Sequence, residues 1–316
     1  MRYLLYVHML IAGYAMPANA NPTFSCAAHQ SMDAVAVDLG LQRIEQWDSQ
    51  SRASFNNNEE IQDNRSKHYD RLFEQCIAAQ FANLDLSSLK NSELEDWLSR
   101  LQSISFYANH KQATQIYDAL AHSAVGRGMD VVSHLEGLVR RYIRLRDFDQ
   151  ANALIKGHVT LSLEPAPTIV GSKAVTSRGL LQFNQEKRSF TQRDFALKGG
   201  VEIVVLSSPM CGPSKRFLKW LNTKPQLVEI FNNNSTWIVP ASGRLHLDQI
   251  AERNKINPNI RLNYVMAQQQ WPEIDYWGTP TFYFYLNKKR IKQIVGWPPE
   301  GRESALVSIL QALKVL

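Results

Sequence analysis

Hydrophobic residues recur at helical spacing through the first half of the chain. Over residues 32–158 large apolar side chains are spaced three and four positions apart, and proline is almost absent. One such set comprises Tyr69, Leu72, Phe73, Cys76 and Ile77. This spacing places the apolar side chains on one face of a helix. The sequence therefore predicts an all-helical domain, with the polar residues 51–64 as a loop between its first helices.

Two stretches of this region share a finer pattern. The first set is Leu135, Leu138, Val139, Tyr142, Ala151 and Ile155, at the offsets of a tetratricopeptide-type helix pair. The second set, 38 residues earlier, is Trp97, Leu101, Ile104, Ala113 and Tyr117. Repeat arrays usually need three or more units to bury a core, so a plain helical bundle is the alternative. If the repeats are real, we expect their concave face to bind a partner protein.

The pattern changes near residue 165, where Pro165 and Pro167 interrupt the helical spacing. Residues 180–183 and 189–191 are strand-like segments separated by the polar residues 184–188, which suggests a β-hairpin. Residues 201–206 follow as a continuous apolar run, typical of a central strand covered on both faces. We therefore predict a helical domain over residues 21–164 and an α/β domain over residues 165–316.

The first twenty residues have the order of a secretory signal peptide. Arg2 precedes an apolar run over residues 4–12, and Ala18-Asn19-Ala20 offers the small-x-small pattern of a cleavage site. A membrane anchor would need about 20 continuous apolar residues, and His8, Gly13 and Pro17 interrupt this run. We expect cleavage after Ala20, a periplasmic or secreted mature protein and no stable membrane insertion.

Charge and composition exclude several classes of function. The net charge is +6, but the basic residues are scattered along the chain, which argues against a nucleic-acid partner. No metal site is expected, because the histidines lack ligand spacing with one another or with a cysteine; they include His110, His122, His134, His158 and His246. The chain also has no glycine-rich phosphate loop and no serine nucleophile elbow, so we expect no cofactor.

The chain has three cysteines, all after the predicted signal peptide: Cys26, Cys76 and Cys211. In an oxidising compartment an odd number implies one pair and one free thiol, or a bridge between chains. Cys26 and Cys76 are the natural structural pair, closing a loop of about 50 residues that a chain-entropy estimate values at about 4 kcal/mol. Cys211 is then left without a partner.

Cys211 stands where the predicted strand gives way to a helix. The segment reads Ser208-Pro209-Met210-Cys211-Gly212-Pro213-Ser214, and Phe217, Leu218 and Leu221 follow as the inward face of an amphipathic helix. Unpaired backbone N–H groups and the positive end of the helix dipole stabilise a thiolate at this position. The sequence thus predicts an activated cysteine.

Cys211-Gly212-Pro213-Ser214 resembles the Cys-Gly-Pro-Cys motif of the thioredoxin superfamily, with serine in place of the second cysteine. The segment Trp277-Gly278-Thr279-Pro280-Thr281 is similar to the cis-proline loop of that family, and a closing hairpin and a terminal helix follow it. The resemblance covers about residues 175–316. It implies a thioredoxin fold with a mixed central sheet, in which Pro280 faces Cys211.

The resemblance also implies how a substrate would bind. Gly212 and Pro213 would line the site, and the backbone of Thr279 would pair with an incoming chain as an extra strand. Three residues depart from the family pattern. Ser214 lacks the second thiol, which would release a bound substrate by internal attack, and Val205 replaces the buried acid that would accept the proton of that thiol. Met210 replaces the usual tryptophan before the cysteine. A longer spacing from Cys211 to Pro280 suggests a helical insertion over the site at residues 245–271.

A lone thiolate can attack a disulfide and form a mixed disulfide, but it cannot release that bond by internal attack. The leading hypothesis is a periplasmic monothiol oxidoreductase or isomerase, with Cys211 as nucleophile and Ser214 donating a hydrogen bond to the thiolate. Its partners would be cysteine-containing client proteins or low-molecular-weight thiols. The alternatives are a non-catalytic client-binding adaptor or chaperone, and a degenerate fold in which Cys211 is inert. Peroxidase chemistry of the peroxiredoxin kind is disfavoured, because it expects proline and threonine where Val204 and Ser208 stand.

Overall fold

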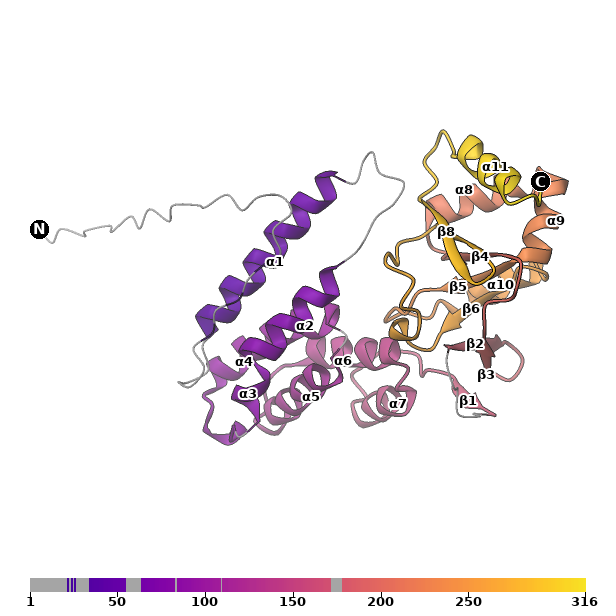
Figure 1. Cartoon of the computed structure of the whole chain (residues 1–316). Helices are drawn as coiled ribbons and strands as arrows, with labels where there is room; N and C mark the ends of the chain where they lie inside the picture. Colours follow the sequence, from indigo (N-terminus) through magenta and orange to yellow (C-terminus); the bar gives the residue numbers. More distant parts are fainter. Residues whose placement is uncertain are drawn as a thin grey trace, which may run out of the picture.

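The helical half of the protein is an array of helices that pack in sequence order (Figure 1). The structure is a computed structural model, and it describes residues 22, 24, 26, 34–54, 64–82, 84–108, 110–171 and 178–316, with the side chains of residues 51–54 left aside. The predicted signal peptide lies outside these residues. The helices are α1 (Ala34–Ser54), α2 (Arg65–Cys76), α3 (Ala78–Phe81), α4 (Asn91–Tyr107), α5 (Lys111–Gly126), α6 (Val132–Leu145) and α7 (Phe148–Gly157), with a 3-10 turn, η2 (Leu86–Ser88), before α4.

Two helix pairs, α4 with α5 and α6 with α7, carry the two similar sequence sets. In each pair the second helix carries a small buried residue, Ala113 in α5 and Ala151 in α7. Helix α1 continues through Ser54, so the first part of the segment 51–64 that we expected to be a loop is helical. Residues 55–63 of that segment lie outside the described residues.

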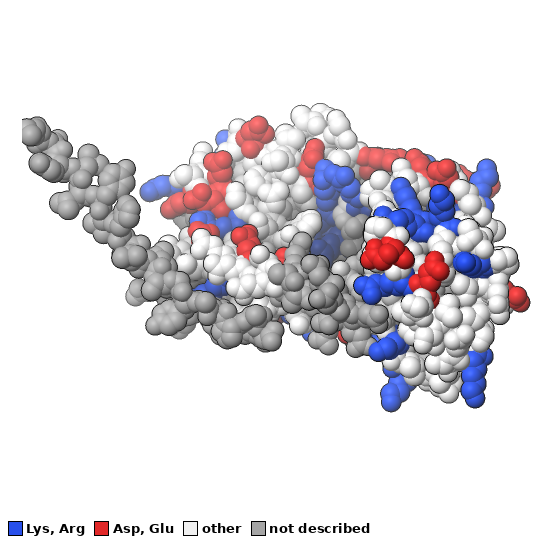
Figure 2. Space-filling model, turned by 90° about the horizontal axis from the view of Figure 1, so that it is seen from above, with Lys and Arg blue, Asp and Glu red and all other residues white. Residues whose placement is uncertain are grey.

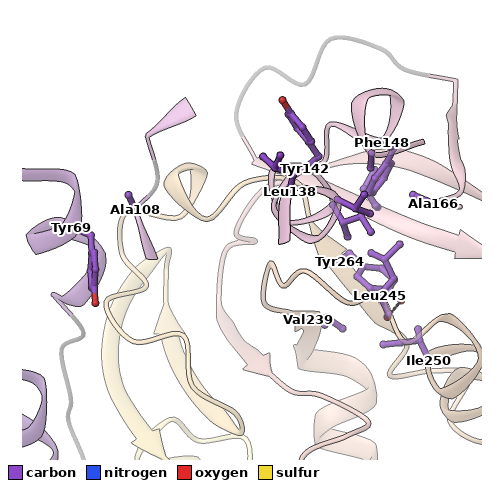
Figure 3. Close-up of a cluster of buried hydrophobic side chains, with 14 of the residues drawn as sticks. Tyr69, Ala108, Leu138, Tyr142, Phe148, Ala166, Val239, Leu245, Ile250 and Tyr264 are labelled. Atoms are coloured by element: carbon purple, nitrogen blue, oxygen red, sulfur yellow. Dashed lines mark hydrogen bonds between the residues drawn. The ribbon is translucent and has the colours of Figure 1, made fainter. Parts of the chain in front are cut away.

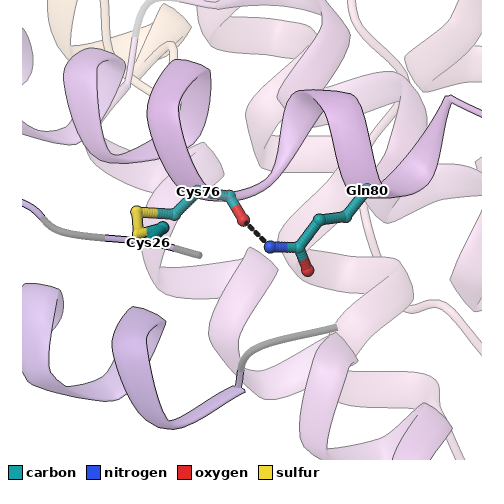
Figure 4. Close-up of a disulfide and its surroundings, with 3 residues drawn as sticks. All are labelled: Cys26, Cys76 and Gln80. Atoms are coloured by element: carbon teal, nitrogen blue, oxygen red, sulfur yellow. Dashed lines mark hydrogen bonds between the residues drawn. A yellow bond between two sulfur atoms is a disulfide. The ribbon is translucent and has the colours of Figure 1, made fainter. Parts of the chain in front are cut away.

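A disulfide joins Cys26 to Cys76 at the end of α2, with the two Cα atoms 5.3 Å apart (Figure 4). The carbonyl oxygen of Cys76 accepts a hydrogen bond of 2.6 Å from Gln80 Nε2. Cys76 itself is buried, whereas Cys211 is half-buried and free. The bond therefore fastens the segment that precedes α1 to the core of the helical domain.

Within the described residues, eight strands form one mixed sheet in the order β1-β3-β2-β6-β5-β4-β7-β8. The strands are β1 (Thr168–Val170), β2 (Arg178–Asn184), β3 (Ser189–Phe195), β4 (Val201–Leu206), β5 (Ser235–Val239), β6 (Leu262–Val265), β7 (Thr281–Leu286) and β8 (Lys289–Val295). The predicted hairpin is β2–β3, and the predicted central strand is β4, which lies between β5 and β7. Strands β4, β5 and β6 are parallel, and β7 is antiparallel to β4.

The strands alternate their side chains between two apolar layers. Ile203 and Val205 of β4 belong to the layer covered by α8 (Gly212–Leu221), α9 (Pro225–Asn234), α10 (Leu247–Ile256) and α11 (Glu303–Ala312). Val204 and Leu206 face the opposite layer, together with Trp271 beside the 3-10 turn η3 (Gln268–Gln270). The β4–α8–α9–β5 crossover and the β7–β8 hairpin followed by α11 together make a thioredoxin fold.

The helical domain packs directly on the sheet at the end of α6 and the start of α7. Phe148 stacks on Phe190 of β3 with ring centroids 5.5 Å apart, and Phe190 meets Tyr264 of β6 at 5.2 Å. Figure 3 shows Phe148 and Tyr264 in this cluster of buried side chains. Arg146, between the two helices, donates from Nε to the carbonyl oxygen of Val265 at 3.0 Å and lies over the Tyr264 ring. The two halves therefore share one continuous apolar core.

Charged side chains of both signs are interspersed on the face shown in Figure 2. Among the helices that the structure describes, none has the length and apolar character needed to cross a bilayer.

Candidate functional site

Cys211 occupies the N-cap position of α8, directly beyond the turn that follows β4. Its φ and ψ angles are −84° and 119°, so the chain is still extended at this residue and becomes helical at Gly212. The turn is closed by the Cys211 N–H, which donates to the Ser208 carbonyl oxygen at 3.1 Å. Pro213 lies in the first helical turn, where its missing N–H costs no hydrogen bond. These features hold the thiol at the positive end of the helix.

Thr279 comes to the same edge of the sheet from the other half of the motif. Strand β7 runs antiparallel to β4 with Thr281 opposite Leu206, so the loop before β7 and the turn after β4 meet. The Cys211 thiol donates to the carbonyl oxygen of Thr279 at 3.0 Å, and the Thr279–Pro280 peptide bond is cis. The juxtaposition of Cys211 with Thr279 and Pro280 that the resemblance implied is thus present in the structure.

A buried tyrosine hydroxyl holds the loop that carries Thr279. Tyr283 of β7 accepts from the N–H of Tyr276 at 3.0 Å and donates to the carbonyl oxygen of the same residue at 2.8 Å. Gln293 of β8 donates to the same hydroxyl at 2.9 Å. Burial, with a smaller effect from Asp275, raises the pKa of Tyr283 above its usual range, so the phenol stays protonated. The loop is therefore anchored three residues before Thr279.

Ser214 lies under Cys211 and is turned into the protein. Its side chain is 4% exposed, and its hydroxyl oxygen accepts from the Ser208 N–H at 3.5 Å. We expected this hydroxyl to donate to the Cys211 sulfur. Among the described contacts the sulfur instead donates to the Thr279 carbonyl oxygen, whereas the buried Ser214 hydroxyl contacts the Ser208 N–H.

Val205 lies in an entirely apolar setting. It is opposite Trp237 on β5 and opposite Phe282 on β7, and all three side chains are buried. A buried acid that could take a proton from a thiol at position 214 is therefore absent at this position. The two departures are consistent with each other, because a site with Ser214 has no second thiol and needs no proton acceptor at Val205.

The longer segment between β5 and β7 is more than the helical insertion that we expected. It contains α10 and also β6, which pairs parallel to β5 and antiparallel to β2 and so widens the sheet. The reason is that residues 262–265 alternate buried side chains on both faces of the sheet, which suits an inner strand. Only then does the chain cross the opposite face of the sheet to reach Thr279.

Helix α10 and helix α8 form the walls of a groove of ≈ 430 Å³. Its lining includes Ser208, Ser214 and Lys215 from the motif region, and Glu252 and Arg253 from α10. Burial lowers the pKa of Arg253 to about 10, so its guanidinium is still charged at neutral pH. The sequence interpretation did not single out Arg253, because a polar helix with one arginine gives no signal for a groove.

No protein-family model and no curated protein sequence matches the chain. Among solved structures, a thioredoxin-like protein from Bacteroides caccae shares 13% identity, over 93% of this chain and 99% of that one, with a TM-score of 0.31. A conserved protein of unknown function from Bacteroides fragilis shares 15% identity, over 44% of this chain and 99% of that one, with a TM-score of 0.30. The thioredoxin fold is instead evident from the strand order, the position of Cys211 and the cis peptide bond.

Over the residues that the structure describes, no group of three or more His, Cys, Asp or Glu side chains is placed to hold a metal ion. The groups that the structure brings together at the site are the Cys211 sulfur and the backbone of Thr279, with the groove beside Ser214.

Proposed function

We propose that this protein is an exported monothiol thiol–disulfide exchange protein, in which Cys211 forms mixed disulfides with cysteine-containing clients. The observation that carries the proposal is the position of the Cys211 sulfur, at the N-cap of α8 and 3.0 Å from the carbonyl oxygen of Thr279. Unpaired N–H groups at that helix end stabilise a thiolate. The Cys26–Cys76 bond supports an oxidising compartment, where structural disulfides persist.

In the resting protein the Cys211 thiol donates a hydrogen bond to the Thr279 carbonyl oxygen. A client strand that pairs with the backbone of Thr279 takes over this acceptor. The thiol then loses its proton to solvent, and the resulting thiolate is held by the end of α8. It attacks one sulfur of the client disulfide, so the Cys211–client S–S bond forms and the other client sulfur leaves as a thiolate.

Release needs a thiol from outside the motif, because Ser214 cannot attack. If a second thiolate of the client attacks the mixed disulfide, the client is isomerised and Cys211 is regenerated as a thiolate. If a low-molecular-weight thiol attacks the client sulfur, Cys211 leaves as a thiolate and the small thiol stays attached to the client. If it attacks the Cys211 sulfur, the client sulfur leaves as a thiolate and the small thiol stays attached to Cys211. In each case one S–S bond breaks as another forms.

The test uses the mature protein and a disulfide-linked dimer of a peptide with one cysteine, analysed on non-reducing gels. Wild-type protein should form a covalent complex that a reducing agent dissolves, and Cys211→Ala should form none. Addition of a small thiol then separates exchange from holding: rapid release with recovery of free Cys211 supports an exchange protein. A complex that forms equally in Cys211→Ala overturns the proposal and favours a noncovalent adaptor.

A further inference from the structure

The groove between α8 and α10 begins at the catalytic motif. Its α8 wall consists of Lys215, Leu218, Lys219 and Asn222. These positions follow Cys211 at steps of three and four, so they lie on the helix face that continues from the cysteine. Ser214, which occupies the place of a resolving cysteine, is also in the lining. The groove therefore leads to the point from which a resolving thiol would attack.

The charges along the groove are mainly positive. Lys215, Lys219 and Arg253 line it with a single acidic side chain, Glu252. Both lysines are exposed, and neither has an ion-pair partner in the part of the chain that the structure describes. An anion in the groove would meet a net of two positive charges.

Arg253 supplies an independent indication of a ligand. Its residue surface is only 9% exposed, and the guanidinium lies over the Trp237 ring, 4.7 Å from the centroid. One terminal nitrogen, Nη1, donates to the carbonyl oxygen of Ile260. The other, Nη2, is buried and has no hydrogen-bond partner among the described residues. A buried cation with an open donor and no paired acid is costly unless an anion compensates it.

The groove is separate from the edge where a client strand would pair. Its lining includes Ser208, Pro209 and Ser214 but neither Thr279 nor Pro280. The reason is the strand order, since β7 and Thr279 lie on one side of β4, whereas β5, β6 and α10 lie on the other. A client on the Thr279 edge therefore leaves the groove accessible.

We propose that this groove binds the carboxylate of an anionic low-molecular-weight thiol, which performs the resolving step in place of the absent second cysteine. The inference rests on the proposed function, because it needs a mixed disulfide at Cys211. The bound thiolate, RS⁻, attacks the Cys211–S–S–client bond. If it attacks the client sulfur, an R–S–S–client bond forms and Cys211 leaves as a thiolate; if it attacks Cys211, the client thiolate leaves and Cys211–S–S–R remains.

The test starts from protein that carries an uncharged peptide in a mixed disulfide on Cys211, with loss of that adduct followed by mass spectrometry. Release is measured with reduced glutathione, which carries two carboxylates, and with neutral 2-mercaptoethanol. The groove variant is Lys215→Gln/Lys219→Gln, in which both changes are at exposed side chains. The matched control is Lys198→Gln, an exposed lysine at the opposite end of β4.

The groove variant should slow release by glutathione about fivefold, which is the loss of two ion pairs of modest strength, and should leave release by 2-mercaptoethanol unchanged. Lys198→Gln should change neither rate. An equal effect of the groove variant on both thiols, or no effect on glutathione, overturns the groove inference while the adduct itself upholds the proposed function. Failure to form any adduct on Cys211 overturns the proposed function and the groove inference with it.

Discussion

The Cys211 sulfur and the Thr279 carbonyl oxygen lie 3.0 Å apart although 68 positions separate them in the sequence. This contact exists because β4 and β7 are neighbours and antiparallel, so the end of one and the start of the other share an edge. It places the Cys211 sulfur beside the backbone group that, in the proposed function, an incoming strand would use. The proposed nucleophile and the proposed client-binding edge are therefore positioned by the same pair of central strands.

We expect Tyr283→Phe to loosen the loop that carries Thr279. The substitution removes the hydroxyl that bonds to the backbone of Tyr276 and leaves the ring in place. Loss of these buried hydrogen bonds should lower the free energy of unfolding by about 1–3 kcal/mol, measured by urea denaturation. The rate of mixed-disulfide formation at Cys211 should change as well. Thr223→Ala, at an exposed residue, is the control.

An unchanged unfolding free energy together with an unchanged reaction rate in Tyr283→Phe would contradict the anchoring role. A loss of stability with an unchanged rate would limit that role to the fold.

Removal of the Cys26–Cys76 bond should destabilise the helical domain. The double variant Cys26→Ser/Cys76→Ser is expected to lose about 2–4 kcal/mol of unfolding free energy, because the closed loop of 50 residues no longer restricts the unfolded chain. Urea denaturation measures the loss. Cys211→Ser is the matched control, since Cys211 is unbonded, and its stability should stay within about 0.5 kcal/mol of wild type. Equal stability of the double variant and the control would contradict the prediction.

Phe148→Ala should weaken the packing of the helical domain on the sheet. Phe148 is buried against Phe190, and truncation of a buried phenylalanine costs about 3–5 kcal/mol. Phe106→Ala is the comparison, because the Phe106 side chain is 60% exposed and should cost much less. Denaturation followed by tryptophan fluorescence and by circular dichroism reports both halves. Similar losses in the two variants would show that the contact between the helical domain and the sheet contributes little to the free energy of unfolding.

The stability of the protein should depend on pH through His68. This side chain is fully buried against Trp47, and burial, aided by the nearby charges of Arg71 and Lys67, lowers the pKa of His68 to about 4 from 6.5. Between these two values the unfolded chain binds the proton and the folded protein does not. The neutral histidine therefore contributes stability above pH 6.5, and up to about 3 kcal/mol is lost as the pH falls toward 4.

The measurement compares urea denaturation at pH 7 and pH 4.5 for wild type, His68→Gln and exposed His122→Gln. His68→Gln should lose part of the acid sensitivity, and His122→Gln should retain it. If all three proteins show the same slope with pH, the effect does not arise at His68.

The sequence predicted the parts of the site that depend on local pattern. The apolar run of β4, the motif at Cys211 and the loop at Thr279 were each recognisable, and the order of the strands then brings them together. The direction of the Ser214 hydroxyl was not predictable, because it depends on how α8 is rotated against the sheet. The groove was missed for a similar reason: Arg253 acquires its setting only when β6 places α10 beside α8. The Phe148–Phe190 contact likewise joins two residues whose spacing carries no shared signal.

The most direct test of the central claim is the fate of a mixed disulfide on Cys211 in wild type and in Ser214→Cys. The adduct is made from a disulfide-linked dimer of a peptide with one cysteine, so the bound peptide carries no second thiol, and intact mass follows it. Wild type should keep the peptide adduct until an outside thiol is added. Ser214→Cys should lose it spontaneously and end two hydrogens lighter than the reduced protein, because Cys211 and the new cysteine then form an internal disulfide. Rapid loss of the adduct from wild type without any added thiol, or no adduct at all, would contradict the account.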